Sequence, residues 1–112
     1  FFGIVARQMR QILVDHARKR NASKRNAGVQ PVTLDEALVS IDRPDALVAI
    51  DEALVELEKH DPRKVRAIEM HYFVGLTHDE IAEVLGVHVN TVARDLRMAE
   101  AWIQRHIKGA PS

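Results

Sequence analysis

The sequence predicts an all-α protein: a small helical bundle preceded by a separate N-terminal amphipathic helix. Two observations support this prediction. Apolar residues make up 46% of the chain and recur at helical spacing, with no strand-like alternation of any length. Most of them are Ala, Val, Leu and Ile, which suit thin helical layers better than a β-sandwich. With 112 residues, the chain is long enough for one small domain and an appendage.

Residues 1–27 form the first predicted unit, which consists of the amphipathic helix. At about 100° per residue, its bulky apolar side chains share one face with a histidine. These residues are Phe2, Val5, Met9, Ile12, Leu13 and His16. Because exposing this face to water is unfavourable, we expect it to pack against the rest of the chain or against a second copy in a homodimer. The other side carries Arg7, Arg10 and Arg18, either as a solvated charged face or as contacts to nucleic-acid phosphates and bases.

The net charge of zero hides a strong asymmetry along the chain. Lys, Arg, Asp and Glu give residues 1–32 a charge of +6, residues 33–61 a charge of −7 and residues 62–112 a charge of +1. A basic first segment suits a phosphate backbone. The acidic middle segment must therefore face away from nucleic acid or toward a basic partner.

Residues 28–43 are predicted to be a linker, because Gly28 and Pro31 break the helical pattern. Residues 44–108 are predicted to hold the bundle. Its first helix starts near Pro44 and repeats apolar residues at helical spacing: Leu47, Ile50, Leu54 and Leu57. A second helix begins at Asp61-Pro62, a carboxylate cap followed by a proline suited to the first turn. It is expected to bury Val65, Ile68 and Tyr72 and to stop before Gly75.

Thr77-His78-Asp79-Glu80 reads as a capping box that opens a short helix. Three apolar residues of this helix face inward, Ile81, Ala82 and Leu85, and the helix ends at Gly86. A final helix follows from about His88 to Ile107. Its inner stripe is expected to contain Val92, Leu96, Ala99 and Ile103, joined by Val89 and Trp102.

Together these features predict a helix-turn-helix. The small Ala82 allows a close crossing, and Gly86 tolerates a left-handed turn. The second helix of such a unit presents its N-terminal outer face to the major groove of DNA. Here the outer face is predicted to hold His88, Asn90, Thr91, Arg94, Asp95 and Arg97. Arg pairs well with guanine and Asn with adenine. The simpler interpretation is a compact helical hairpin without a DNA partner.

The same residues resemble a known family, the extracytoplasmic-function (ECF) type of sigma factor within the sigma-70 family. Residues 1–27 resemble the last helix of region 2, and residues 44–108 resemble region 4, which is winged-helix-like without the wing. The motifs are Phe2-Gly3-Ile4-Val5-Ala6-Arg7, Asp15-His16-Ala17-Arg18, Leu76-Thr77 through Glu80-Ile81-Ala82, Thr91-Val92, and Arg94-Asp95-Leu96-Arg97 with Ala101-Trp102-Ile103.

The resemblance implies a bacterial, cytoplasmic transcription initiation factor. Region 4 of the family binds the −35 promoter element and docks on the β flap of RNA polymerase. The last region 2 helix helps to recognise the −10 element, and the rest of region 2 binds the β′ coiled coil. The resemblance also implies that an anti-sigma factor is a possible partner. The chain begins Phe1-Phe2-Gly3 inside a helical pattern without an initiator Met, so we expect a piece of a longer protein that lacks most of region 2.

On this basis the candidate DNA-binding residues fall into three groups. Thr77 and His78 are expected to meet the phosphate backbone at a helix N-terminus. The main readers are expected on the final helix: His88, Asn90, Thr91, Arg94 and Arg97. Arg7, Arg10 and Arg18 are a further set on the first helix. The chain departs from the family at Ala93, where many members carry a basic residue, and at His88, where Ser or Pro is common. We therefore expect base readout to shift to Arg94 and the final helix to be less well capped.

Other function classes find less support. No nucleophile–base spacing or phosphate-cradling glycine loop predicts an enzyme, and no cofactor is expected. The chain has no cysteine, and a metal site from His71, His78 and His88 would join different helices without a supporting ligand pattern. No apolar run is long enough to cross a membrane. The DNA-binding domain of a response regulator, which uses a similar Leu-Thr-x-x-Glu-Ile-Ala unit, and a pure interaction module remain as alternatives.

Overall fold

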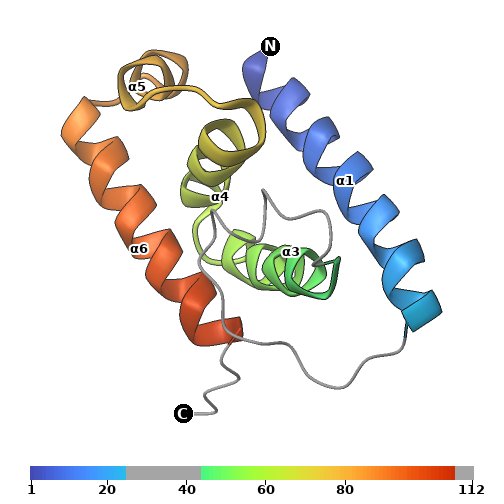
Figure 1. Cartoon of the computed structure of the whole chain (residues 1–112). Coiled ribbons are helices and arrows are strands. Elements are labelled where there is room, and N and C mark those ends of the chain that lie inside the picture. The colour runs from blue at the N-terminus through green and yellow to red at the C-terminus, as the bar shows by residue number, and fades with distance from the viewer. Residues whose placement is uncertain (25–43, 108–112) are drawn as a thin grey trace.

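The computed structural model describes residues 1–24 and 44–107, and it describes the side chains of 1–20 and 44–107. Within these residues the chain is helical and contains no strand (Figure 1). The helices are α1 (Phe2–Lys24), α3 (Pro44–Glu58), α4 (Pro62–Ile68), the π-helical segment η1 (Glu69–Val74), α5 (His78–Leu85) and α6 (Val89–Ile107). The linker predicted at 28–43, the end of the first unit at 25–27 and residue 108 lie outside the described residues.

The helices enclose one core. In Figure 1, α1 and α6 lie on opposite sides of α3 and α4, and α5 lies near the start of α6. α6 contacts α3, α4 and α5, whereas α1 contacts α3 and η1. The core combines the apolar stripes of all these helices, and its largest fully buried apolar residues are Ile50, Leu54, Val65, Ile68, Met70, Ile81, Val92 and Ile103. The all-α prediction and the predicted inner stripe of α6 are confirmed.

The helix predicted to run from Asp61-Pro62 to Gly75 is present, but its second half is wound differently. Asp61 caps α4 by accepting a hydrogen bond from the Lys64 amide, and Gly75 ends η1 with a left-handed φ of 89°. Residues 69–74 are π-helical, with hydrogen bonds from i to i+5. Each turn then holds more residues, so the inward positions shift from the predicted Tyr72, which is only partly buried, to Met70 and Phe73, five residues after Val65 and Ile68.

The expectation that α1 packs against the rest of the chain is confirmed, and the helix is not separate, because Ala6 is fully buried in the main core. The prediction of which face packs is wrong, because it is not the bulky apolar one. The packed face carries Ala6, Arg10, Val14 and Ala17, all at most 5% exposed. The bulky face is left largely to solvent, with exposed fractions of 42% for Phe2, 39% for Met9, 67% for Ile12 and 41% for Leu13.

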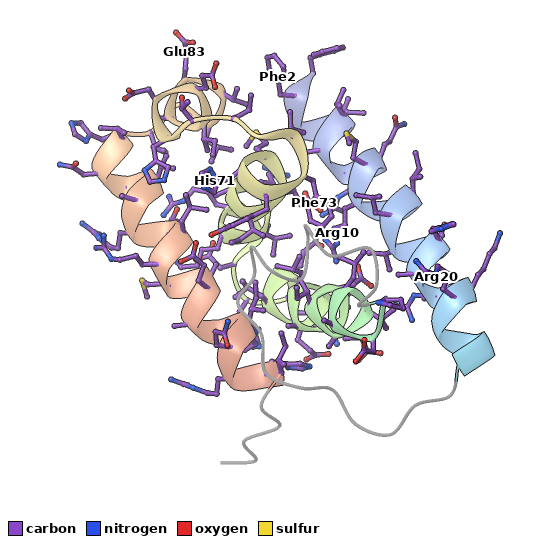
Figure 2. The ribbon with its side chains drawn as sticks, in the orientation of Figure 1. Phe2, Arg10, Arg20, His71, Phe73 and Glu83 are labelled. Carbon is purple, nitrogen blue, oxygen red and sulfur yellow. The ribbon has the colours of Figure 1, made fainter. Side chains whose placement is uncertain are left out.

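The reason for this choice of face is the pairing of charge along the chain. Figure 2 shows Arg10 on the side of α1 that faces the other helices. Arg10 donates to Asp51 of α3 at 2.9 Å and to Glu69 of η1 at 2.7 Å. The small side chains of Ala6 and Ala17 allow α1 to approach closely enough for these bonds. Of the two alternatives for the acidic segment, facing away from nucleic acid or toward a basic partner, its described residue Asp51 follows the second within the chain itself.

Candidate nucleic-acid interface

α5 begins with the predicted capping box. The Thr77 hydroxyl accepts from the Glu80 amide at 3.2 Å, and the Glu80 carboxylate accepts from the Thr77 amide at 2.8 Å. Two backbone donors at the helix end are thereby satisfied. Ile81 and Ala82 are buried, and Glu83 points away from the molecule in Figure 2.

The turn between α5 and α6 depends on Gly86, whose φ of 70° and ψ of 33° are left-handed. The amides of Gly86 and Val87 both donate to the Ala82 carbonyl, at 2.9 and 3.1 Å. The chain then enters α6 at Val89. His88 caps this helix, because its Nδ1 accepts from the Asn90 amide at 3.0 Å. The imidazole thus caps the helix where the family commonly has Ser or Pro, and the expectation that this helix is less well capped stays a prediction.

The polar side of α6 faces outward. Val92, Leu96, Ala99 and Ile103 are buried, whereas His88, Asn90, Arg94 and Arg97 are exposed and Thr91 is half-buried. The helix is anchored further along, where the Trp102 indole donates to the Ala53 carbonyl at 3.0 Å and the Tyr72 hydroxyl donates to Glu100. An exposed row of amide, hydroxyl and guanidinium groups is therefore carried on a helix whose other side is fixed in the core.

Asp95 was predicted on this outer face, and the structure places it inside. It is 2% exposed and receives two hydrogen bonds from Arg63 of α4, from Nε to Oδ2 at 2.7 Å and from Nη2 to Oδ1 at 3.3 Å. The Lys64 ammonium lies 3.6 Å from Oδ1. The bond to Asp95 raises the pKa of the Arg63 guanidinium above its usual value. A signal was available in the sequence: Asp95 lies three residues after Val92 and four before Ala99, which is an inner-stripe position.

Thr77 and His78 lie together at the N-terminus of α5. Thr77 is exposed and His78 half-buried. The ring of His78 lies 5.2 Å from that of His71 between centroids, and His71 Nδ1 donates to the Leu76 carbonyl at 2.9 Å. The two residues were considered together from the sequence only as part of an unsupported metal site with His88, and the structure places their rings side by side. Within residues 1–24 and 44–107, no group of three or more His, Cys, Asp or Glu is placed to hold a metal ion.

Arg7, Arg10 and Arg18 of α1 are each paired with acidic residues. Arg7 donates to Glu58 at 2.8 Å, and this bond raises its pKa. Arg18 donates to Asp51 at 2.9 Å, and Arg10 is buried as described above. In this arrangement Arg10 cannot reach a phosphate, and Arg7 and Arg18 would have to exchange their carboxylate partners for one. The DNA-contact prediction for these three residues therefore finds no support in the geometry.

Among residues 1–24 and 44–107, no helix combines the length and apolar character that a membrane span needs. The fold and the interface thus define an all-helical protein in which α6 carries an exposed polar and basic face and is anchored in the core.

Comparison with known proteins identifies the family. The chain matches the family model of the ECF sigma factor over residues 1–109, nearly its whole length. It belongs to that family, whose members initiate transcription with RNA polymerase and promoter DNA and are not enzymes. Neither the curated proteins nor the solved structures contain a match. Membership of this family decides against the response-regulator alternative.

Proposed function

We propose that this sigma factor reads the −35 promoter element in the major groove with α6, and that α5, Gly86–His88 and α6 act as a helix-turn-helix. The supporting observation is the outward polar face of α6 at its N-terminal end. Helices of this kind contact base edges with their first turns. Asn90, Arg94 and Arg97 are exposed there, and within the described part of the chain neither arginine forms an ion pair that would compete with DNA.

The phosphate backbone is proposed to meet the N-terminus of α5 and the first turn of α6. At a helix N-terminus, backbone amides and the helix dipole favour an anion. Thr77 and His78 provide this end in α5, and His88 and Thr91 flank it in α6. Contacts of this kind fix the register of the protein on the duplex, whereas base contacts specify the sequence.

The division of the chain is proposed as expected from the sequence: residues 1–27 as the end of region 2, 28–43 as the linker and 44–108 as region 4. We also propose that region 4 docks on the β flap of RNA polymerase and that region 2 docks on the β′ coiled coil. We further propose that an anti-sigma factor regulates the protein and that the protein is cytoplasmic. Two copies are proposed to pair through the exposed apolar face of α1.

The experiment that tests this function is selection of duplexes from a random DNA library by the chain. An enriched motif is expected, and Arg94→Ala is expected to lose about 1–3 kcal/mol of discrimination, roughly 5- to 150-fold, at one position of it. Arg105→Ala is the matched control, because Arg105 is also exposed on α6 but lies in its last turn. Failure to enrich any motif would contradict base readout, and equal loss on all sequences would reduce Arg94 to a phosphate contact.

A further inference from the structure

α6 carries one buried carboxylate in the part of the helix that faces promoter DNA, and the function proposed above does not use it. Asp95 has a side chain only 3% exposed and lies between Arg94 and the buried Leu96. Its partners, Arg63 and Lys64, come from the first turn of α4. No buried side-chain nitrogen or oxygen among the described residues lacks a hydrogen-bond partner, so the carboxylate is satisfied rather than strained.

The bond between Asp95 and Arg63 has a property that the apolar contacts of α6 with α4 lack. Apolar contacts such as those of Val92 and Leu96 are non-directional and scale with the area they bury. A guanidinium that bonds both oxygens of a carboxylate fixes distance and angle together. The bond therefore defines how far α6 is rotated about its own axis relative to α4.

The α4 side of this bond is itself held in place. Asp61 caps α4 by accepting from the Lys64 amide at 3.4 Å, and the Lys64 ammonium also pairs with the Asp61 carboxylate. Lys64 is thereby shared between Asp61 and Asp95. The four charged side chains form one network that joins the start of α4 to the second turn of α6.

We propose that Asp95 is a positioning residue for promoter recognition: with Arg63 and Lys64, it sets the rotation of α6 at which Asn90 and Arg94 meet base edges. This inference rests on the proposed function, since it requires that α6 reads DNA. Successive residues of a helix differ by about 100° in direction. Arg94 is the neighbour of Asp95 in the chain, so any rotation that Asp95 permits displaces Arg94 by the same angle.

The test compares two variants with one control. Arg63→Lys keeps the positive charge and loses the two-point geometry. Asp95→Asn keeps the shape and loses the charge. Arg66→Lys is the control, because Arg66 lies one turn further along α4 and is exposed. Each chain is tested, at a temperature where circular dichroism shows it folded, against the duplex enriched by the wild-type chain and against a shuffled duplex.

We expect Arg63→Lys and Asp95→Asn to lower the ratio of the two affinities by about tenfold, the size of one good base contact. Binding to the shuffled duplex and its salt dependence should stay as in the wild type, because phosphate contacts supply them. Arg66→Lys should leave the ratio unchanged.

A lower melting temperature with an unchanged affinity ratio in Arg63→Lys would show that the network only stabilises the fold, and would overturn the inference. If Asp95→Asn folds, an unchanged affinity ratio in that variant would overturn the inference in the same way. If it does not fold, the affinity ratio of Arg63→Lys alone tests the inference. If the wild-type chain enriches no motif at all, the proposed function fails and the inference fails with it. That result is distinct from an enriched motif that both variants read as well as the wild type.

Discussion

Arg10 of α1 donates to the Glu69 carboxylate of η1 at 2.7 Å, and the two side chains are only 6% and 1% exposed. Asp51 of α3 accepts from the same guanidinium at 2.9 Å. One buried arginine thus joins the basic first segment to two acidic groups on different helices. Buried charges are stable only when they are paired and hydrogen-bonded. The attachment of α1 to the rest of the protein depends on this arginine.

Arg10→Ala is therefore expected to destabilise the protein by about 3–5 kcal/mol, because it leaves two carboxylates without their main partner. Urea unfolding followed by circular dichroism measures this change. Arg18→Ala is the control: Arg18 bonds the same Asp51, but its side chain is 48% exposed, and such pairs contribute about 1 kcal/mol or less. Equal small effects for the two variants would show that α1 does not depend on the buried pair.

The orientation of α1 can be tested with two apolar residues two positions apart. Val14 is 4% exposed and Ile12 is 67% exposed. We expect Val14→Ala to destabilise by about 1–3 kcal/mol and Ile12→Ala to change stability by less than about 0.5 kcal/mol. The reverse order would mean that the bulky apolar face packs in solution, as the sequence pattern predicted.

Substitution by alanine is expected to lower the stability of the protein at Gly86 and to raise it at Gly3. Gly86 has a left-handed φ of 70°, so Gly86→Ala should cost about 1–2 kcal/mol from backbone strain alone, since no atom lies within 4 Å of the added Cβ. Gly3 lies within α1 with open space around it, and Gly3→Ala should stabilise by about 0.5–1 kcal/mol. Thermal unfolding compares them, and a Gly86→Ala chain as stable as the wild type would rule out this turn.

Acid should weaken the protein partly through Asp61. The hydrogen bond from the Lys64 side chain is the main cause that lowers the pKa of Asp61 below its usual value in the folded state. Its contribution is therefore present above the unfolded pKa of about 3.9 and is lost as the pH falls through the folded pKa. Asp61→Asn keeps a capping side chain without the charge.

We expect the Asp61→Asn chain to melt below the wild type near neutral pH, with the gap between the two closing as the pH falls below about 4. Melting temperatures measured from pH 7 downward test this. A gap that stays constant with pH would show that the carboxylate charge at Asp61 contributes nothing to stability.

Local signals predicted the C-terminal half of the structure well. The capping box at Thr77, the left-handed Gly86 and the inner stripe of α6 each depend on residues close together in the chain. Such patterns fix local conformation and the inward face with little help from distant segments. The burial of Asp95 was not predicted, because a charged side chain is usually expected on the surface. Its position in the helical pattern alone indicated the interior.

Long-range pairing explains what the sequence did not reveal. The face of α1 that packs is the one that carries Arg10. Its partners Asp51 and Glu69 are 41 and 59 residues away in the chain. Apolar periodicity alone predicted that the bulky face of α1, and not the face of small residues, would be buried. The π-helical winding of 69–74, which brings Met70 and Phe73 inward in place of Tyr72, has no evident sequence signal.

The claim that the outward face of α6 enters the major groove is tested most directly by removing purine N7 atoms from bound DNA. The duplex enriched by the chain is prepared with 7-deazapurine at one position at a time, and binding of the wild type is compared with that of the Asn90→Ala/Arg94→Ala double variant. Purine N7 is exposed only in the major groove. We predict positions at which the change weakens the wild type by about 1–3 kcal/mol and leaves the double variant unaffected. No sensitive position, or equal sensitivity in both proteins, would contradict the account.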